Sequence, residues 1–295
     1  MTPHLWFDKE AKEAAEFYAS LFANSKVTNV TTITDTPSGD CDLVSFHLRG
    51  HEFRAISAGP YFKINPSISF IVSYDASQNK DAKDNIDSVW EKLVQGGTVL
   101  MALDKYPFSE RYGWVQDKFG LSWQLITTNP EMGERSDILS SLMFVGDNSG
   151  KAEEAINFYR SVFKDSKSGA LFHYGEGDKP NSVMFADFKL LDLGFAAMDS
   201  PGEHQFNFNE AISFMVNCDT QKEIDYYWDA LSAVPESEQC GWLKDKYGVS
   251  WQIIPSIMEE VMASGDQKKV ARLTQAFLKM KKFDLDKILE AAEEK

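Results

Sequence analysis

The sequence is poor in cysteine, in positive charge and in long apolar runs, and each shortage excludes a class of protein. The cysteines, Cys41, Cys218 and Cys240, are odd in number and lack a C-x-x-C spacing, which argues against a disulfide framework and a zinc ribbon. Lysine and arginine number 30 against 45 acidic residues, a net charge of −15 that would repel nucleic acid and anionic membrane surfaces. Because neither a signal-like N-terminus nor a run of about 18 apolar residues occurs, we expect a cytoplasmic protein without a membrane anchor.

The remaining composition is that of an ordinary folded protein. Hydrophobic residues make up 43% of the 295 positions and aromatic residues 13%, whereas glycine occurs 18 times and proline 10 times. A disordered or low-complexity chain is therefore excluded. At about 150 residues per domain, the length predicts two domains, each large enough to bury a core without disulfides.

An internal repeat is the strongest signal in the sequence. Three segments of the first half return in the same order in the second half: DKEAKEAAEFYASLF (8–22) as SGKAEEAINFYRSVF (149–163), ISFIVSYD (68–75) as ISFMVNCD (212–219), and GWVQDKFGLSWQLI (113–126) as GWLKDKYGVSWQII (241–254). We interpret this as a tandem duplication, with copy one at 1–130, a linker at 131–136, copy two at 137–255 and a helical C-terminal extension at 256–295.

Each copy has the periodicity of a mixed fold. The first repeated segment has apolar residues at helical spacing, and short runs of β-branched and aromatic residues around it predict strands. The predicted order is β-α-β-β-β followed by β-α-β-β, with room for a further strand around 98–102. The tetrapeptides DKFG and DKYG predict tight turns, in which Asp117 and Asp245 have a structural role.

Side chains alternate across a strand, so the repeated strands have two distinct faces. One face is wholly apolar, as packing against helices requires, and the other collects polar groups suited to a ligand cleft. The predicted ligand-binding residues of copy one are His4, Trp6, Ser67, Ser69, Ser122 and Gln124. Their equivalents in copy two are Ser141, Met143, Ser213, Ser250 and Gln252. The second set is poorer in polar chemistry, so we expect the site in copy one; no catalytic residue is assigned.

The runs HLWFDKEAKEAAEFYASLF, GPYFKINPSISF, CGWLKDKYGVSWQIIPS and AFLKMKKFDLDKILEAA resemble the PhnB-like branch of the vicinal oxygen chelate superfamily. This superfamily includes glyoxalases, bleomycin-resistance proteins and extradiol dioxygenases. The resemblance implies an α+β fold in which paired βαβββ modules curl around a cleft. The branch is also labelled as a 3-demethylubiquinone-9 3-methyltransferase domain, but no G-x-G-x-x-G turn for a methyl donor occurs, and GEGDKP at 175–180 reads as a loop.

The resemblance also indicates where a metal would bind. Metal-using members take ligands from three strand positions, which correspond to His4, Ser67 and Gln124 in copy one and to Ser141, Ala211 and Gln252 in copy two. A lone histidine with neutral serine and glutamine is a weak ligand set for a divalent ion. We therefore expect neither a metal nor another cofactor.

Three functions remain open at this stage, and the first two imply a small molecule as the partner. The first is metal-free binding or sequestration, and the second is an enzyme, such as a lyase, an isomerase or a dioxygenase-like protein. The third is a scaffold whose copies mainly pair with each other, which predicts a cleft plugged by side chains instead of an open cavity. Whether the copies pair within one chain or across a homodimer is also open.

The C-terminal extension is expected to form two docked helices. Ser256 and Glu259 have the spacing of a capping box, and Met258, Val261 and Met262 follow as an apolar stripe. A second helix is predicted with an apolar side made of Val270, Leu273, Phe277 and Met280. Because such short helices are unstable alone, both should pack on an apolar surface.

Overall fold

The computed structural model describes residues 1–128, 136–175 and 182–293. The chain divides into two compact units. Unit 1 comprises Met1–Ser20, Asn24–Lys63 and Phe208–Lys295, and unit 2 comprises Leu21–Ala23 and Ile64–Asn207. The linker expected at 131–136 lies, apart from Ser136, outside the described residues.

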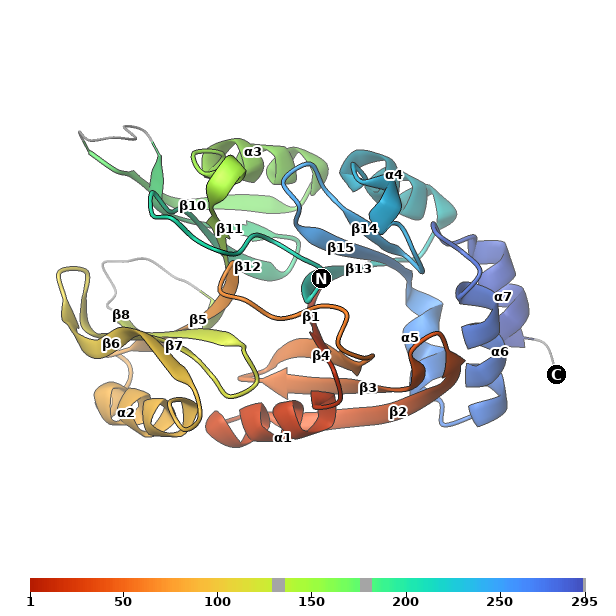
Figure 1. The fold of residues 1–295 in the computed structure, drawn as a ribbon, viewed down its shortest axis with the longest axis horizontal. Coiled ribbons are helices and arrows are strands. Elements are labelled where there is room, and N and C mark those ends of the chain that lie inside the picture. Colours follow the sequence, from red (N-terminus) through yellow and green to blue (C-terminus); the bar gives the residue numbers. More distant parts are fainter. Residues whose placement is uncertain (129–135, 176–181, 294–295) are drawn as a thin grey trace. The chain divides into compact units, whose positions relative to one another are not determined.

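Unit 1 is built on a seven-stranded mixed sheet of order β14-β15-β13-β1-β4-β3-β2 (Figure 1). Its strands are β1 (Thr2–Phe7), β2 (Lys26–Thr36), β3 (Gly39–Leu48), β4 (His51–Ser57), β13 (Ile212–Cys218), β14 (Trp242–Lys244) and β15 (Ser250–Pro255). Its helices are α1 (Ala11–Leu21), α4 (Gln221–Leu231), a short 3-10 turn (Pro235–Ser237), α5 (Ser256–Ala263), α6 (Gln267–Phe277) and α7 (Leu285–Glu293).

Unit 2 is built on an eight-stranded mixed sheet of order β10-β11-β12-β9-β5-β8-β7-β6. Its strands are β5 (Ile68–Asp75), β6 (Thr98–Tyr106), β7 (Ser109–Gln116), β8 (Ser122–Thr128), β9 (Ile138–Phe144), β10 (Ser166–His173), β11 (Val183–Leu190) and β12 (Leu193–Asp199). Its helices are α2 (Ala82–Leu93), a short 3-10 turn (Gly146–Asn148) and α3 (Ala152–Val162).

The compact units do not follow the boundaries of the sequence copies. Unit 1 joins the first half of copy one to the second half of copy two, whereas unit 2 joins the two remaining halves. The reason is strand pairing: β1 pairs antiparallel with β13, and β5 pairs antiparallel with β9. The halves of each copy therefore contribute to different sheets, and the modules pair within one chain.

The apolar faces predicted for the repeated strands form part of the core of each unit. Leu5 and Phe7 on β1, and Phe70 and Val72 on β5, are all at most 4% exposed. The expected α+β fold is therefore confirmed, with α1 and α4 on the outer face of the unit 1 sheet and α2 and α3 on that of the unit 2 sheet (Figure 1).

The two predicted turns are also confirmed. In unit 1, Oδ1 of Asp245 accepts hydrogen bonds from the backbone N–H groups of Tyr247 (2.8 Å) and Val249 (3.0 Å). Its Oδ2 accepts a third from the indole of Trp251 (2.9 Å). Asp117 makes the same three bonds in unit 2. The glycine ending each tetrapeptide has φ of +88° or +87°, which favours glycine over any residue with a Cβ.

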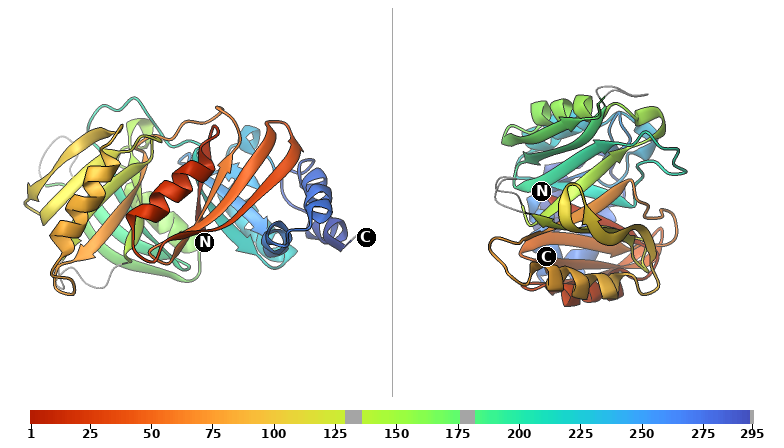
Figure 2. Two further views of the ribbon diagram at one scale, coloured as in Figure 1. Left: turned by 90° about the horizontal axis from the view of Figure 1, so that it is seen from below. Right: turned by 90° about the vertical axis from the view of Figure 1, so that its left-hand side faces the viewer.

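The C-terminal extension docks on unit 1, as the sequence predicts, but it forms three helices, α5, α6 and α7, instead of the two expected. Met258, Val261, Leu273 and Phe277 join one buried cluster with residues of β2 and β3, and α6 and α7 lie at the end of the unit beside β2 (Figure 2). The predicted capping box is wrong, because α5 continues directly from β15 with Pro255 at its N-cap position. No helix among the described residues is long and apolar enough to cross a bilayer.

Candidate functional site

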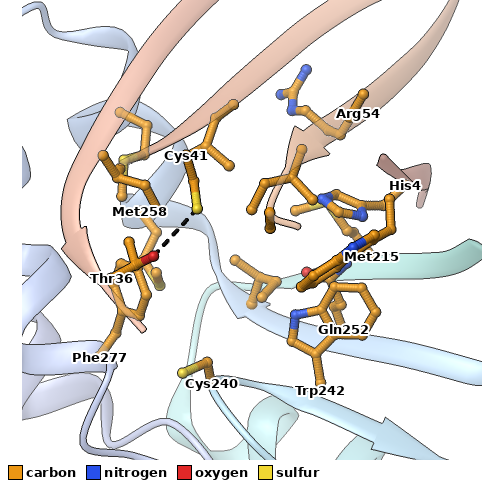
Figure 3. A pocket seen from close by; sticks show the side chains of 18 of the residues that line it. His4, Thr36, Cys41, Arg54, Met215, Cys240, Trp242, Gln252, Met258 and Phe277 are labelled. Carbon is orange, nitrogen blue, oxygen red and sulfur yellow. Dashed lines mark hydrogen bonds between the residues drawn. The ribbon is translucent and has the colours of Figure 1, made fainter. Parts of the chain in front are cut away.

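A cavity of about 830 Å³ lies on the inner side of the unit 1 sheet (Figure 3). Strands β1 and β13–β15 supply one wall, β2–β4 a second, and the C-terminal helices a third. Its apolar lining includes Trp6, Ile33, Leu43, Ile56, Phe62, Met215, Trp242, Ile254, Met258, Met262, Phe277 and Phe283. The cavity is thus mainly apolar, and its polar lining includes His4, Arg54, Gln252 and several serine, threonine and glutamate side chains.

His4 is one of the polar residues that line the cavity. It lies on β1, between β4 and β13, and is 5% exposed. Its ring meets the indole of Trp242 edge-on at a centroid distance of 5.4 Å, and among the described residues its Nδ1 has no hydrogen-bond partner. Burial, and secondarily the charge of Arg54, lower the pKa of His4 to about 3. The imidazole is therefore neutral at pH 7.

Arg54 lies beside His4 and connects the sheet to the C-terminal helices. It is in register with His4 across the parallel β1–β4 pair. Its guanidinium contacts Glu52 on the same strand at 2.6 Å and Glu259 on α5 at 3.2 Å. Two carboxylates therefore balance one cation, so Arg54 offers little net positive charge to the cavity.

Gln252 on β15 presents its side-chain oxygen to the cavity. Its Nε2 donates a hydrogen bond to the Ser213 hydroxyl at 2.9 Å. Among the residues that the structure describes, no donor is bonded to its Oε1. Figure 3 shows Gln252 grouped with His4, Met215 and Trp242, opposite Met258 and Phe277.

The side chain of the equivalent glutamine in unit 2 has a hydrogen-bond partner at both its nitrogen and its oxygen. Gln124 donates through Nε2 to Ser69 (2.8 Å) and accepts at Oε1 from the hydroxyl of Tyr112 (2.8 Å). Tyr112 is 6% exposed, and Tyr106 and Phe108 pack edge-on against its ring. In the repeat, Cys240 occupies the position of Tyr112, so unit 1 lacks this phenol.

The predicted ligand-binding residues are divided between the units. Unit 1 contains His4, Trp6, Ser213, Ser250 and Gln252, whereas unit 2 contains Ser67, Ser69, Ser122, Gln124, Ser141 and Met143. The expected cleft within copy one is therefore not assembled, since β1 and β8 belong to different sheets. His4, Trp6 and Gln252 line the unit 1 cavity, and their role as ligand contacts stays a prediction.

The sequence reasoning missed three residues of this cavity: Arg54, Trp242 and Cys240. Trp242 pairs across the β14–β15 hairpin with Gln252 and so shares its face. A comparison of the two copies contained a signal for Cys240, because it replaces a tyrosine just before the repeated Gly-Trp.

The residues at the expected metal positions do not fit a divalent cation. Unit 1 brings together His4, Ala211 and Gln252, and unit 2 brings together Ser67, Gln124 and Ser141. The unit 1 set offers one imidazole, one amide and a methyl group, and it supplies no carboxylate or thiolate ligand. In the described part of the chain, no three His, Cys, Asp or Glu side chains form a potential metal cluster.

Comparisons with known proteins agree with the resemblance seen in the sequence. The model of the family described as 3-demethylubiquinone-9 3-methyltransferase matches residues 1–126 and again 136–254. Among solved structures, the PhnB protein of Bacillus cereus is 34% identical over 43% of this chain and 98% of its own, with a TM-score of 0.39.

A second solved structure relates to nearly the whole chain. Glyoxalase I of Zea mays is 12% identical over 88% of this chain and 93% of its own, with a TM-score of 0.51, and at this identity shows the fold alone. None of the curated proteins matches the sequence significantly. With a family match in each copy and the tandem glyoxalase-like fold, the chain belongs to the PhnB-like 3-demethylubiquinone-9 3-methyltransferase family of the vicinal oxygen chelate superfamily.

Proposed function

We propose that the protein binds a small, mainly apolar molecule in the unit 1 cavity and holds it without chemical change. The observation that carries this proposal is the cavity itself: about 830 Å³, mostly apolar, with His4 and Gln252 at one side. Pockets for small ligands are typically about 300–1,000 Å³, with apolar walls and a few placed polar groups. A scaffold would instead have its cleft filled by side chains. In unit 2, the side chain of Tyr112 takes the space in front of Gln124 in this way.

Binding is favoured over catalysis by the chemistry of the polar groups. A general base works best with a pKa near the working pH, and the pKa of His4 is about 3. His4 and Gln252 are a neutral imidazole and a neutral amide, and the guanidinium of Arg54 is already paired with Glu52 and Glu259. Methyl transfer, which the family description names, would need a donor site. The one candidate segment, 175–180, lies outside the described residues apart from Gly175.

The test is a metabolite pull-down with a cavity-filling variant. Met258→Trp would fill the cavity from α5, and Met184→Trp is the matched control because Met184 is 46% exposed on unit 2. The purified proteins are mixed with a cell extract, washed and analysed by mass spectrometry after denaturation. A molecule retained by the wild type and the control, absent from Met258→Trp and recovered unchanged supports the proposal.

Other results of the same experiment contradict the proposal. If Met258→Trp retains the molecule as well as the wild type does, the ligand binds outside the cavity. If none of the three proteins retains a molecule, the proposed binding function is wrong. Recovery of a chemically altered molecule would favour the enzyme, whether lyase, isomerase or dioxygenase-like. Melting curves of all three proteins establish that each is folded before the comparison.

A further inference from the structure

In unit 2, the side chains of Trp114 and Gln124 both have hydrogen-bond partners, so this unit is the reference for the equivalent positions of unit 1. There, the indole N–H of Trp114 donates to the Ser122 hydroxyl at 2.9 Å. The neighbouring Gln124 is hydrogen-bonded at both ends, through Ser69 and Tyr112. These side chains of β7 and β8 thus have hydrogen-bond partners within the sheet, on β5, β7 and β8.

In unit 1 the same positions leave a donor and an acceptor unmatched. Trp242 is the repeat equivalent of Trp114, yet among the described residues its Nε1–H has no acceptor. Ser250, the equivalent of Ser122, has a buried hydroxyl without a partner in the same part of the chain. Among the same residues Gln252 Oε1 has no donor, and Cys240 occupies the repeat position of Tyr112, whose phenol donates to Gln124 in unit 2.

The unmatched donor and acceptor lie next to each other. Trp242 and Gln252 are directly paired across the antiparallel β14–β15 hairpin, so their side chains are on the same face. Both line the cavity, and in Figure 3 the indole nitrogen and the amide oxygen are on the side of the open space. A single head group of a ligand can therefore reach both.

The charges around the cavity disfavour an ionic head group. Arg54 is already bonded to Glu52 and Glu259, and Lys244 is bonded to Glu210 at 2.9 Å. Glu236 adds a further carboxylate to the lining, so the charged groups there carry more negative than positive charge and would repel an anion. A cation would leave the indole N–H without an acceptor, and leaving such a group unmatched is costly.

We propose that the ligand of the unit 1 cavity has an apolar body and an uncharged head of the carboxamide kind, whose oxygen accepts from Trp242 Nε1–H and whose N–H donates to Gln252 Oε1. This inference rests on the proposed binding function and names the class of ligand. It gives both unmatched groups a partner without changing the charge of the cavity.

The test compares four probes that differ only in their head group: 4-phenylbutanamide, 4-phenylbutanoate, 4-phenylbutylamine and butylbenzene. Calorimetric titration should show the amide binding about tenfold more tightly than the acid or the amine, because each ionic head group can pair with only one of the two unmatched groups. Trp242→Phe and Gln252→Met should each weaken amide binding about fivefold and leave butylbenzene nearly unaffected. Trp90→Phe in unit 2 and Gln275→Met on the exposed side of α6 are the matched controls.

The outcomes separate this inference from the proposed function. If all four probes bind equally and Met258→Trp abolishes their binding, the cavity is a ligand site but the head-group inference is wrong. An acid or amine that binds as well as the amide, or variants that weaken every probe alike, also overturns it. If no probe binds at its solubility limit, the proposed binding function fails as well.

Discussion

Cys240 in unit 1 and Tyr112 in unit 2 occupy the same position of the sequence repeat, one residue before the repeated Gly-Trp. The Tyr112 hydroxyl bonds the side-chain oxygen of Gln124 at 2.8 Å, whereas the thiol of Cys240 lines the open cavity of unit 1. At this position the two equivalent modules therefore differ in whether the glutamine oxygen has a phenol as its donor.

Cys240→Tyr should close the unit 1 cavity. The introduced ring would occupy part of the cavity that the Cys240 side chain lines. We expect the affinity for butylbenzene to fall about tenfold or more, measured by calorimetric titration. Cys240→Ala, which leaves the space open, is the control and should bind normally. Unchanged binding by the folded tyrosine variant would contradict the role of this position.

Burial of neutral His4 should make stability depend on pH. Its pKa is about 3 in the folded protein and about 6.5 when unfolded, so the unfolded chain binds more protons between these values. The stability contribution is complete above about pH 6.5 and is lost as the pH falls. Between pH 7 and pH 5 the wild type should lose about 2 kcal/mol of unfolding free energy from this group.

Urea unfolding of His4→Phe at both pH values isolates that contribution. Phenylalanine keeps a ring beside Trp242 but cannot be protonated, so the variant should lack this part of the pH dependence. The other histidines are common to both proteins and cancel in the comparison. An identical pH dependence in the two proteins would show that His4 is readily protonated in the folded state.

Asp245→Asn should destabilise unit 1 through its turn. The amide nitrogen cannot accept the indole hydrogen bond of Trp251 if the remaining oxygen keeps its bonds to the backbone of Tyr247 and Val249. We expect a loss of about 1–3 kcal/mol in the free energy of unfolding, measured in urea. Asp286→Asn, on the exposed start of α7, is the control. A variant as stable as the control would contradict the structural role of the turn.

Deletion of residues 256–295 should leave the strands able to pair but expose an apolar surface. Ile33, Cys41 and Ala58 are buried in one cluster with α5, α6 and α7. Without these helices, that surface and the opened cavity should cause aggregation or altered association. Light scattering and size-exclusion chromatography measure this. A truncated chain that stays soluble, with an unchanged melting temperature and elution volume, would show that the extension is dispensable.

Local features were predictable from the sequence because each depends on residues that are close along the chain. The alternation that buries Leu5 and Phe7, the turns built by Asp117 and Asp245, and the apolar sides of the C-terminal helices are all of this kind. The repeat itself, with the family resemblance, further predicted the tandem glyoxalase-like fold. The prediction of a capping box at Ser256 was wrong because α5 begins directly after β15. The spacing of Ser256 and Glu259 alone does not reveal this junction.

The sequence by itself thus determined the elements, their faces and the family, and only the tertiary structure decided which modules share a sheet. Modules related by a repeat have similar strand edges, so no local pattern shows that β1 pairs with β13 and β5 with β9. That pairing separates His4 from Gln124 and brings it together with Gln252. The cavity exists because non-local strand pairing and helix docking place Cys240, Arg54 and Met258 around it, residues that lie far apart along the chain.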